Sequence, residues 1–357
     1  MQPNIFIQTL KPYIPIAHKI WEIPNHKDIL KLDWNESTLP PSPQVLLALH
    51  KALENDHLHW YPNTKNDTLL QLLSTYTKLP SSCIETFASS DCAHEFILQV
   101  FAMAGDRVCI IAPTYDNFRS SAQGRGLQSV FFHTNSGNIE WEKLDTFLES
   151  NAPQMLYICN PNNPTGTLHD TNALTKLIQK YADIMFIVDE AYYEFCGISL
   201  AHIVPHTPNL IITRTFSKAF GLASLRIGYV LSTAQNITAL NRLRNAKNIP
   251  HLSQIGAIAA LENIAYMQDY VKEVKQGRQY FLQVLGEMRD LYVYTTEANF
   301  VFLRYDKAEN LCEFLESKHI FIRNYAHILP SHCRISIGTK AQMQKVAHYM
   351  QDFITQN

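Results

Sequence analysis

The sequence predicts an α/β protein with a large domain, built on a mostly parallel sheet covered by helices, and a smaller α+β domain. Short apolar runs alternate with helical patterns between residues 108 and 231. These runs are almost continuously apolar, as strands buried on both faces should be. The first four of them end in polar or turn-forming residues. The length of 357 residues also exceeds the usual size of one core and suits two domains.

The elements are expected in the following order. Residues 1–40, rich in Pro, form an N-terminal arm and the start of the small domain, residues 41–253 form the large domain, and residues 254–357 form the small C-terminal domain. In the last of these, one long helix over 254–287 precedes two strand-like segments, 298–304 and 334–337. The strand-like runs of the large domain are 108–112, 155–159, 185–188, 210–213 and 227–231.

The composition excludes several classes of partner. Lys plus Arg total 30 against 32 for Asp plus Glu, so the net charge of -2 gives no reason to expect nucleic-acid or membrane binding. No apolar run is long enough to span a bilayer and no signal peptide is visible, so we expect a cytoplasmic protein. The seven cysteines include no C-x-x-C pair and read as free thiols. Without an H-E-x-x-H motif, no metal site is expected.

The most informative stretch is TFSKAFGLASLRIGY, residues 215–229. A lysine after an apolar strand is usually solvated, but Lys218 has Thr215 and Ser217 before it and Arg226 after it. Hydroxyls and a guanidinium can hold a phosphate. A lysine near a positive charge and away from water has a lowered pKa and becomes nucleophilic. The stretch therefore suits an aldehyde cofactor that bears a phosphate.

Three further stretches carry candidate site residues, and the first two follow strands that end at the same predicted sheet edge as Lys218. In IVDEAYYEF, Asp189 is either a helix N-cap or the counter-ion of a protonated pyridine nitrogen, and Tyr192 can point to the same site. In CNPNNPTG, the loop is either a plain connection or a rigid display of Asn163 toward a phenolic oxygen. In ASSDCAHEF, the residues around Ser90 either cap a helix or bind phosphate through backbone N–H groups at its start.

The order and grouping of NPNNPTG, VDEAYYEF and SKAFGLASLRIGY make the chain resemble fold-type-I pyridoxal-phosphate aminotransferases of class I/II. The resemblance is greatest to histidinol-phosphate aminotransferases and covers essentially the whole length. It implies an aspartate-aminotransferase-like fold, pyridoxal 5'-phosphate as cofactor and a homodimer. An enzyme of this kind exchanges an amino group between glutamate/2-oxoglutarate and a second substrate.

The resemblance also implies roles for the cofactor residues. Lys218 would carry the cofactor as a Schiff base and move the proton, Asp189 would keep the pyridine nitrogen protonated, and Tyr115 would stack on the ring. Asn163 and Tyr192 would contact the phenolic oxygen. The phosphate would be bound by Ser90, Asp91, Cys92, Thr215, Ser217 and Arg226, and by Tyr61 of the neighbouring subunit.

Substrate residues follow from the same resemblance, with departures. Arg334 in CRISIGT would bind a carboxylate, while Tyr13 in LKPYIP and Arg323 in FIRN resemble segments that contact a phosphorylated substrate. Tyr13 could equally pack a terminal arm, and Arg323 could form a surface ion pair. Asn35 remains in LDWNEST, which departs from the usual N-E-N-P, and Cys92 stands where an acidic residue is common. NAKNIPHLS brings Lys247 and Asn248 near the expected substrate, or leaves Lys247 in solvent.

Histidinol phosphate or a similar phosphorylated amine is the favoured substrate. The extra cation Lys247 would suit a small anion better than an imidazole ring, so a small phosphorylated ketone is an alternative. Decarboxylation of phosphoserine or phosphothreonine is another. A non-catalytic module of the same fold lacks support because all cofactor residues are present. A nicotinamide dehydrogenase lacks the G-x-G-x-x-G motif.

Overall fold

A computed structural model describes residues 1–13, 19–55 and 57–356 of the chain. Its larger sheet has seven strands in the order β2-β8-β7-β6-β5-β3-β4. The pairs from β4 through β7 are parallel, whereas β8 runs antiparallel to both β7 and β2. The strands are β2 (Ile84–Phe87), β3 (Arg107–Ala112), β4 (Gln128–His133), β5 (Met155–Cys159), β6 (Met185–Asp189), β7 (Leu210–Thr215) and β8 (Gly228–Leu231).

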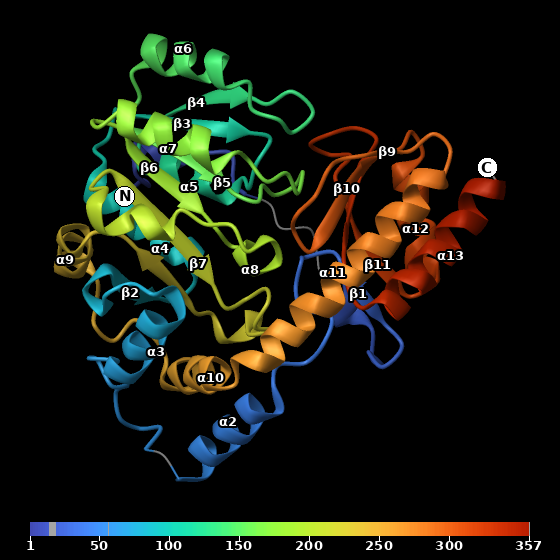
Figure 1. The fold of residues 1–357 in the computed structure, drawn as a ribbon, viewed down its shortest axis with the longest axis horizontal. Coiled ribbons are helices and arrows are strands. Elements are labelled where there is room, and N and C mark those ends of the chain that lie inside the picture. The colour runs from blue at the N-terminus through green and yellow to red at the C-terminus, as the bar shows by residue number, and fades with distance from the viewer. Residues whose placement is uncertain (14–18, 56, 357) are drawn as a thin grey trace.

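The smaller sheet has five strands in the order β1-β11-β12-β10-β9. Its edge strand β1 comes from the N-terminal segment and pairs in parallel with β11 near the other end of the chain. In Figure 1 the two sheets occupy separate halves of the molecule, and α11 runs from one half toward the other. The strands are β1 (Leu30–Leu32), β9 (Tyr292–Val293), β10 (Phe300–Arg304), β11 (Ile320–Asn324) and β12 (His332–Ser336).

Helices cover both sheets. Within the larger half they are α4 (Ser90–Phe101), α5 (Asn117–Gly124), α6 (Trp141–Asn151), α7 (Thr171–Lys180), α8 (Tyr193–Cys196) and α9 (Ala234–Leu243), with α2 (Pro43–Asn55), α3 (Asp67–Thr77) and α10 (His251–Glu262) grouped beside them. The smaller sheet is covered by α11 (Ile264–Glu287), α12 (Ala308–Ser317) and α13 (Lys340–Gln356). A short α1 (Ile5–Gln8) and 3₁₀ turns at 19–22, 81–83, 201–206 and 223–225 complete the chain.

The predicted fold class is confirmed, with one error in its elements. The apolar runs after residue 108 are the buried strands β3, β5, β6 and β7. The single helix expected over 254–287 is wrong, because α10 ends at Glu262 and α11 begins at Ile264, with Asn263 between them. Asn favours helix ends since its side chain bonds elsewhere, and here its amide donates to Ser42 Oγ at 2.7 Å. The proposed domain bounds, 1–40, 41–253 and 254–357, stay a prediction. Residues 14–18 of the predicted arm lie outside the described residues.

Candidate active site

The carboxyl ends of β3, β5, β6 and β7 meet at one edge of the larger sheet. Tyr115, Asn163 and Lys218 follow β3, β5 and β7, and Asp189 is the last residue of β6, so four separate segments deliver polar side chains to one place. Residues 33–35 and strand β12 of the smaller half meet the same edge, where Lys218, Tyr192 and Asn163 each bond to them. The candidate site therefore lies where the two halves of the molecule touch.

Lys218 is partly buried in the loop that follows β7. Its Nζ donates a hydrogen bond of 2.9 Å to the backbone oxygen of Trp34 and lies 5.8 Å from the centre of the Tyr192 ring. Burial lowers the pKa of this amine to about 8, although the charge of Glu36 opposes the shift. About a tenth of the amine is therefore unprotonated at pH 7, far more than for a lysine with an ordinary pKa, and the neutral amine is the nucleophilic form.

Asp189 is buried at the end of β6 and surrounded by hydrogen-bond donors. The hydroxyl of Tyr157 donates to Oδ2 at 2.9 Å, while Ala191 N–H and the Thr213 hydroxyl donate to Oδ1 at 3.1 and 3.3 Å. Burial raises the pKa of this carboxyl, and the nearby His94 opposes the rise. Within the described residues no Lys or Arg lies within 4 Å of it, so a cationic ring nitrogen would supply the missing partner.

A second group of polar atoms surrounds the start of α4. Ser89 caps this helix, because its hydroxyl oxygen accepts a hydrogen bond from Cys92 N–H at 3.2 Å. The backbone N–H of Cys92 therefore already has a partner, and Ser90 and Asp91 are the first two residues of the helix. Thr215 donates to Ser217 Oγ at 2.9 Å, and Arg226 reaches the same oxygen at 3.5 Å and Asp91 at 3.7 Å. Hydroxyls, one guanidinium and a helix N-terminus thus converge, and groups of this kind could hold a phosphate.

Gly228 permits this convergence. A Cβ at this position would lie 2.7 Å from Ser90 N and 2.7 Å from the backbone oxygen of Arg214. Any side chain would therefore push the start of α4 away from β7 and β8. The glycine after Arg226 and Ile227 is explained by this close approach.

A buried ion pair supports both groups from behind. Arg214 Nε donates to Glu190 Oε2 at 2.9 Å, and both side chains are about 2% exposed. Ser199 bonds to both partners, and the guanidinium lies 3.6 Å from the centre of the Tyr193 ring. Since Glu190 follows Asp189 and Arg214 precedes Thr215, the pair fixes the two strand ends that carry the site.

The N-terminal segment contributes to the site mainly through its backbone. Asn35 is buried, and its amide donates to the Tyr192 hydroxyl at 3.1 Å, while Ser336 Oγ donates to Asn35 Oδ1. The backbone oxygens of the two residues before it accept from Arg334 and from Lys218. Asn163 is likewise buried, and its Oδ1 accepts a hydrogen bond from Arg334.

Two arginines of the smaller sheet lie opposite each other across β11 and β12. Arg323 and Arg334 are direct antiparallel partners, so both side chains point to the same face. Both are buried, and within the described residues neither has a carboxylate within 4 Å. Arg334 bonds to neutral acceptors, among them the Tyr325 hydroxyl at 3.1 Å. Burial lowers the pKa of Arg323, and the charge of Arg334 lowers it further.

Tyr13 and Tyr115 close the site on the side of the N-terminal arm. Their ring centres are 5.9 Å apart with an edge-on arrangement. Burial raises the pKa of each hydroxyl, and for Tyr13 the charge of Arg323 opposes that rise. The arm therefore brings one aromatic ring to the arginine pair.

Three predicted residues lie apart from this group within one chain. Tyr61 is 77% exposed, and Lys247 Nζ lies 4.2 Å from the centre of its ring. Asn248 accepts from Arg244 at 2.9 Å, and Arg244 is itself paired with Glu85. A single chain thus leaves Tyr61 and Lys247 as an exposed pair and gives Asn248 a local partner.

Several residues that bond to the predicted ones were not predicted from the sequence. Tyr157 lies in an otherwise apolar buried strand, and its hydroxyl needs a partner there, which is a signal that could have been used. Trp34 contributes a backbone oxygen, for which no side-chain pattern exists. Tyr325 and Ser336 follow from the pairing of β11 with β12, which the sequence did not predict.

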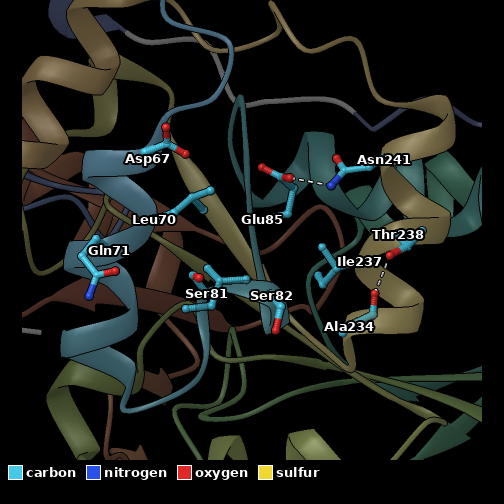
Figure 2. Close-up of a pocket in the computed structure, with 11 residues that line it drawn as sticks. Asp67, Leu70, Gln71, Ser81, Ser82, Glu85, Ala234, Ile237, Thr238 and Asn241 are labelled. Atoms are coloured by element: carbon cyan, nitrogen blue, oxygen red, sulfur yellow. Dashed lines mark hydrogen bonds between the residues drawn. The ribbon is translucent and has the colours of Figure 1, made fainter.

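Figure 2 shows a hollow elsewhere on the molecule, between α3, β2 and α9. It contains Asp67 and Glu85, but Glu85 is satisfied by Asn241 at 2.7 Å and by Arg244 at 3.1 Å. In the described ranges we find neither a cluster of three metal-ligating side chains nor a helix long and apolar enough to cross a membrane. Unlike this hollow, the sheet edge holds buried charged side chains, Asp189, Arg323 and Arg334, that have no oppositely charged Lys, Arg, Asp or Glu within 4 Å among the described residues.

The donors and acceptors at the sheet edge fit pyridoxal phosphate. Asp189 presents a buried carboxylate where a pyridine nitrogen would sit, and Lys218 presents an amine of lowered pKa. Thr215, Ser217 and Arg226 lie close together and could hold its phosphate. We found no residue among these whose chemistry conflicts with that cofactor.

Comparisons with known proteins agree with this geometry. The family described as aminotransferase class I and II matches residues 27–350. A dihydroxyacetone phosphate transaminase of Campylobacter jejuni is 48% identical over 99% of this chain and 97% of its own length. A histidinol-phosphate aminotransferase of Ruminiclostridium cellulolyticum is 33% identical over 88% of this chain and 89% of its own. The histidinol-phosphate aminotransferase of Sinorhizobium meliloti, solved with pyridoxal-5'-phosphate, has a TM-score of 0.88, 25% identity and coverage of 99% and 98%.

Proposed function

The chain belongs to the class I and II aminotransferases, and from this premise we propose that it aminates a small phosphorylated ketone such as dihydroxyacetone phosphate. The cofactor is pyridoxal phosphate, as the sequence predicted. Glutamate and 2-oxoglutarate form the other substrate pair, and the two half-reactions alternate at one site.

The observation that carries the proposal is the pair Arg323 and Arg334. Like charges directly opposite each other on a sheet repel, and a buried guanidinium without a carboxylate partner is costly. An anionic substrate would relieve both costs. A phosphate carries up to two negative charges and accepts the fork of a guanidinium, so it matches the pair better than a single carboxylate does.

Each residue of the site then has a separate role in the proposed reaction. The bound cofactor supplies an electron sink that weakens the bonds at the substrate carbon carrying the nitrogen. Lys218 would take the proton from that carbon and hand it on within the site, because its amine is the basic group of lowered pKa at the centre of the site. Asp189 would hold the ring nitrogen, and Arg323 with Arg334 would hold the anionic end of the substrate. Tyr13 and Tyr115 exclude water from one side.

The sequence identities of the relatives are used to rank the candidate substrates. The 48% identical relative is named for dihydroxyacetone phosphate, and it spans nearly the whole chain. We keep histidinol phosphate as the second candidate because a relative named for it is 33% identical over 88% of the chain. Both carry a phosphate, so the arginine pair serves either one.

The test follows the visible absorption band of the cofactor-loaded enzyme during addition of an amine. The amine counterpart of dihydroxyacetone phosphate and L-histidinol phosphate are compared, each with its dephosphorylated form. We expect the first to remove the band most efficiently, and loss of the phosphate to lower kcat/KM by about 100-fold or more, because two buried cations stay unpaired. The variant Arg323→Met should lose most of this preference, whereas the exposed Arg289→Met, in the same half of the molecule, should keep it.

Two results would overturn the proposal. Equal reaction with and without the phosphate would show that the arginine pair does not select it. Release of carbon dioxide from phosphoserine or phosphothreonine, without any keto acceptor, would identify a decarboxylase instead.

The active unit is a homodimer in which Tyr61 reaches the phosphate of the neighbouring cofactor. Support comes from large apolar side chains that are exposed on and after α2, since exposed apolar groups that lie together often mark protein–protein contacts. The test mixes Tyr61→Ala with Lys218→Ala, two variants that each disable every site of their own homodimer. Mixed dimers regain one intact site, so about a quarter of the activity should return if sites are shared. No recovery would show that each chain builds its site alone. The exposed residues are Leu46, Leu47, Leu53, Leu58, Trp60 and Tyr61.

A further inference from the structure

His94 is a buried histidine on the rear side of the candidate site. It lies on α4, four residues after Ser90, and is 1% exposed. Its Nε2 is 3.0 Å from Thr213 Oγ1 and 3.9 Å from Asp189 Oδ2. None of the roles assigned above uses this side chain.

The hydrogen positions follow from the number of donors. An ionised Asp189 can only accept, so the Thr213 hydroxyl must donate its one hydrogen to Oδ1, at 3.3 Å. The oxygen of Thr213 then accepts from His94, and the hydrogen of the imidazole is on Nε2. This gives a chain of two bonds that runs from His94 through Thr213 to Asp189. In the part of the chain that the structure describes, Nδ1 has no partner.

The ring cannot turn away from this arrangement. Phe118 and Tyr157 each present an edge-on contact to it, with ring centres 5.5 Å away, and these two rings stack on each other at 3.9 Å. Tyr157 is also the donor to Asp189 Oδ2. The same ring packing therefore orients both His94 and the Tyr157 hydroxyl that donates to Asp189.

The charges around Asp189 act in opposite directions. Asp91, at the start of α4, raises the pKa of the Asp189 carboxyl, as burial does, whereas His94 and the Tyr157 bond lower it. His94 therefore works against protonation of a carboxylate that must stay ionised to hold a cationic ring nitrogen. It does so from the helix whose first residues belong to the phosphate end of the site.

We propose that His94 is a positioning residue that keeps Asp189 ionised and correctly oriented through Thr213. As a result α4 supports both ends of the cofactor, the phosphate at its N-terminus and the ring nitrogen one turn later. The helix packs against β7 and β8, so its position decides both contacts together (Figure 1). The inference rests on the role proposed for Asp189.

The experiment compares His94→Leu, which removes the donor, with His94→Gln, whose amide can occupy the place of Nε2–H. Cofactor-free protein is titrated with pyridoxal phosphate, and the pH dependence of the visible band is recorded for each loaded form. We expect His94→Leu to raise the Kd about tenfold or more and to shift the pH profile of the band, since a hydrogen bond that supports a charged group is lost. His94→Gln should return the Kd to within about threefold of the original protein.

Further variants separate the possible failures. Thr213→Val interrupts the same chain without changing His94 and should reproduce the effect of His94→Leu, which protects the test if the leucine variant folds poorly. Asp189→Asn examines the premise: an unchanged Kd there would remove the role of Asp189 itself. If Asp189→Asn weakens binding while His94→Leu leaves both the Kd and the pH profile unchanged, His94 has no positioning role. A glutamine variant as impaired as the leucine variant would also contradict the donor chain.

Discussion

Replacing Arg214 by Met should destabilise the protein far more than breaking an exposed ion pair would. Both Arg214 and Glu190 are about 2% exposed, so the substitution leaves a carboxylate buried without its cation. Removing one partner of a buried pair typically costs about 3–5 kcal/mol. Ser199 and the N–H of Leu200 still donate to Glu190, which favours the lower end of that range.

The loss can be measured by thermal unfolding of the cofactor-free protein. At about 2–4 °C per kcal/mol for chains of 150–250 residues, and somewhat less for a longer one, Tm should fall by roughly 5–10 °C. The matched control is Lys180→Met, which breaks the exposed pairs with Asp145 and Glu149 and should leave Tm nearly unchanged.

The double variant Arg214→Met/Glu190→Gln tests the physical reason. It removes both charges of the pair, so it should recover a substantial part of the lost Tm, because Glu190 no longer remains as a buried charge without its partner. A double variant as unstable as the sum of its single variants would refute the reasoning. So would an Arg214→Met variant that is no less stable than Lys180→Met.

Three further predictions concern the site itself. The rate at which cofactor-free protein captures pyridoxal phosphate should rise about tenfold per pH unit below pH 8 and level off above it. The reason is that the neutral fraction of the Lys218 amine rises until the pH passes its pKa of about 8. Stopped-flow absorbance measures this rate, and a flat pH profile would contradict the prediction. Gly228→Ala should weaken cofactor binding, because its Cβ would displace the start of α4. Gly286→Ala is the control, because a Cβ there would meet no atom within 4 Å, and it should bind the cofactor normally. Titration of each cofactor-free variant with pyridoxal phosphate measures the difference. Tyr157→Phe removes the hydroxyl that donates to the buried Asp189 carboxylate at 2.9 Å and should raise the cofactor Kd about tenfold or more. Tyr181→Phe removes a hydroxyl at the end of α7 that bonds to Asp145 instead, and it should leave the Kd unchanged.

The parts of the fold that were predictable are those whose side chains face one environment along the whole element. β5 and β7 are buried at every position and therefore appear as apolar runs. β4 is an edge strand with mixed exposure, and β9 has only two residues, so neither produces such a run. The break at Asn263 was missed because the apolar pattern continues across it.

The candidate site divides in the same way. Lys218 and Asp189 lie next to buried strands, so their place at the sheet edge follows from local pattern. The partners of Lys218 and Arg334 include backbone oxygens of residues 33 and 34, and every residue has such an oxygen, so no sequence pattern can identify them. The opposition of Arg323 and Arg334 depends on strand pairing, which is decided by the tertiary fold. Tyr61 requires a second chain to be tested.

Strand β1 has a consequence for how the chain folds during synthesis. Leu30 pairs with Ile320, so the N-terminal strand must wait until almost the entire polypeptide has left the ribosome. The seven-stranded sheet, whose strands all lie between residues 84 and 231, can assemble before that. The oxygens of residues 33 and 34 reach Arg334 and Lys218 only once β1 has joined β11. A nascent chain should therefore contain an ordered larger sheet with an incomplete reaction centre, and translation of the last strands should complete it.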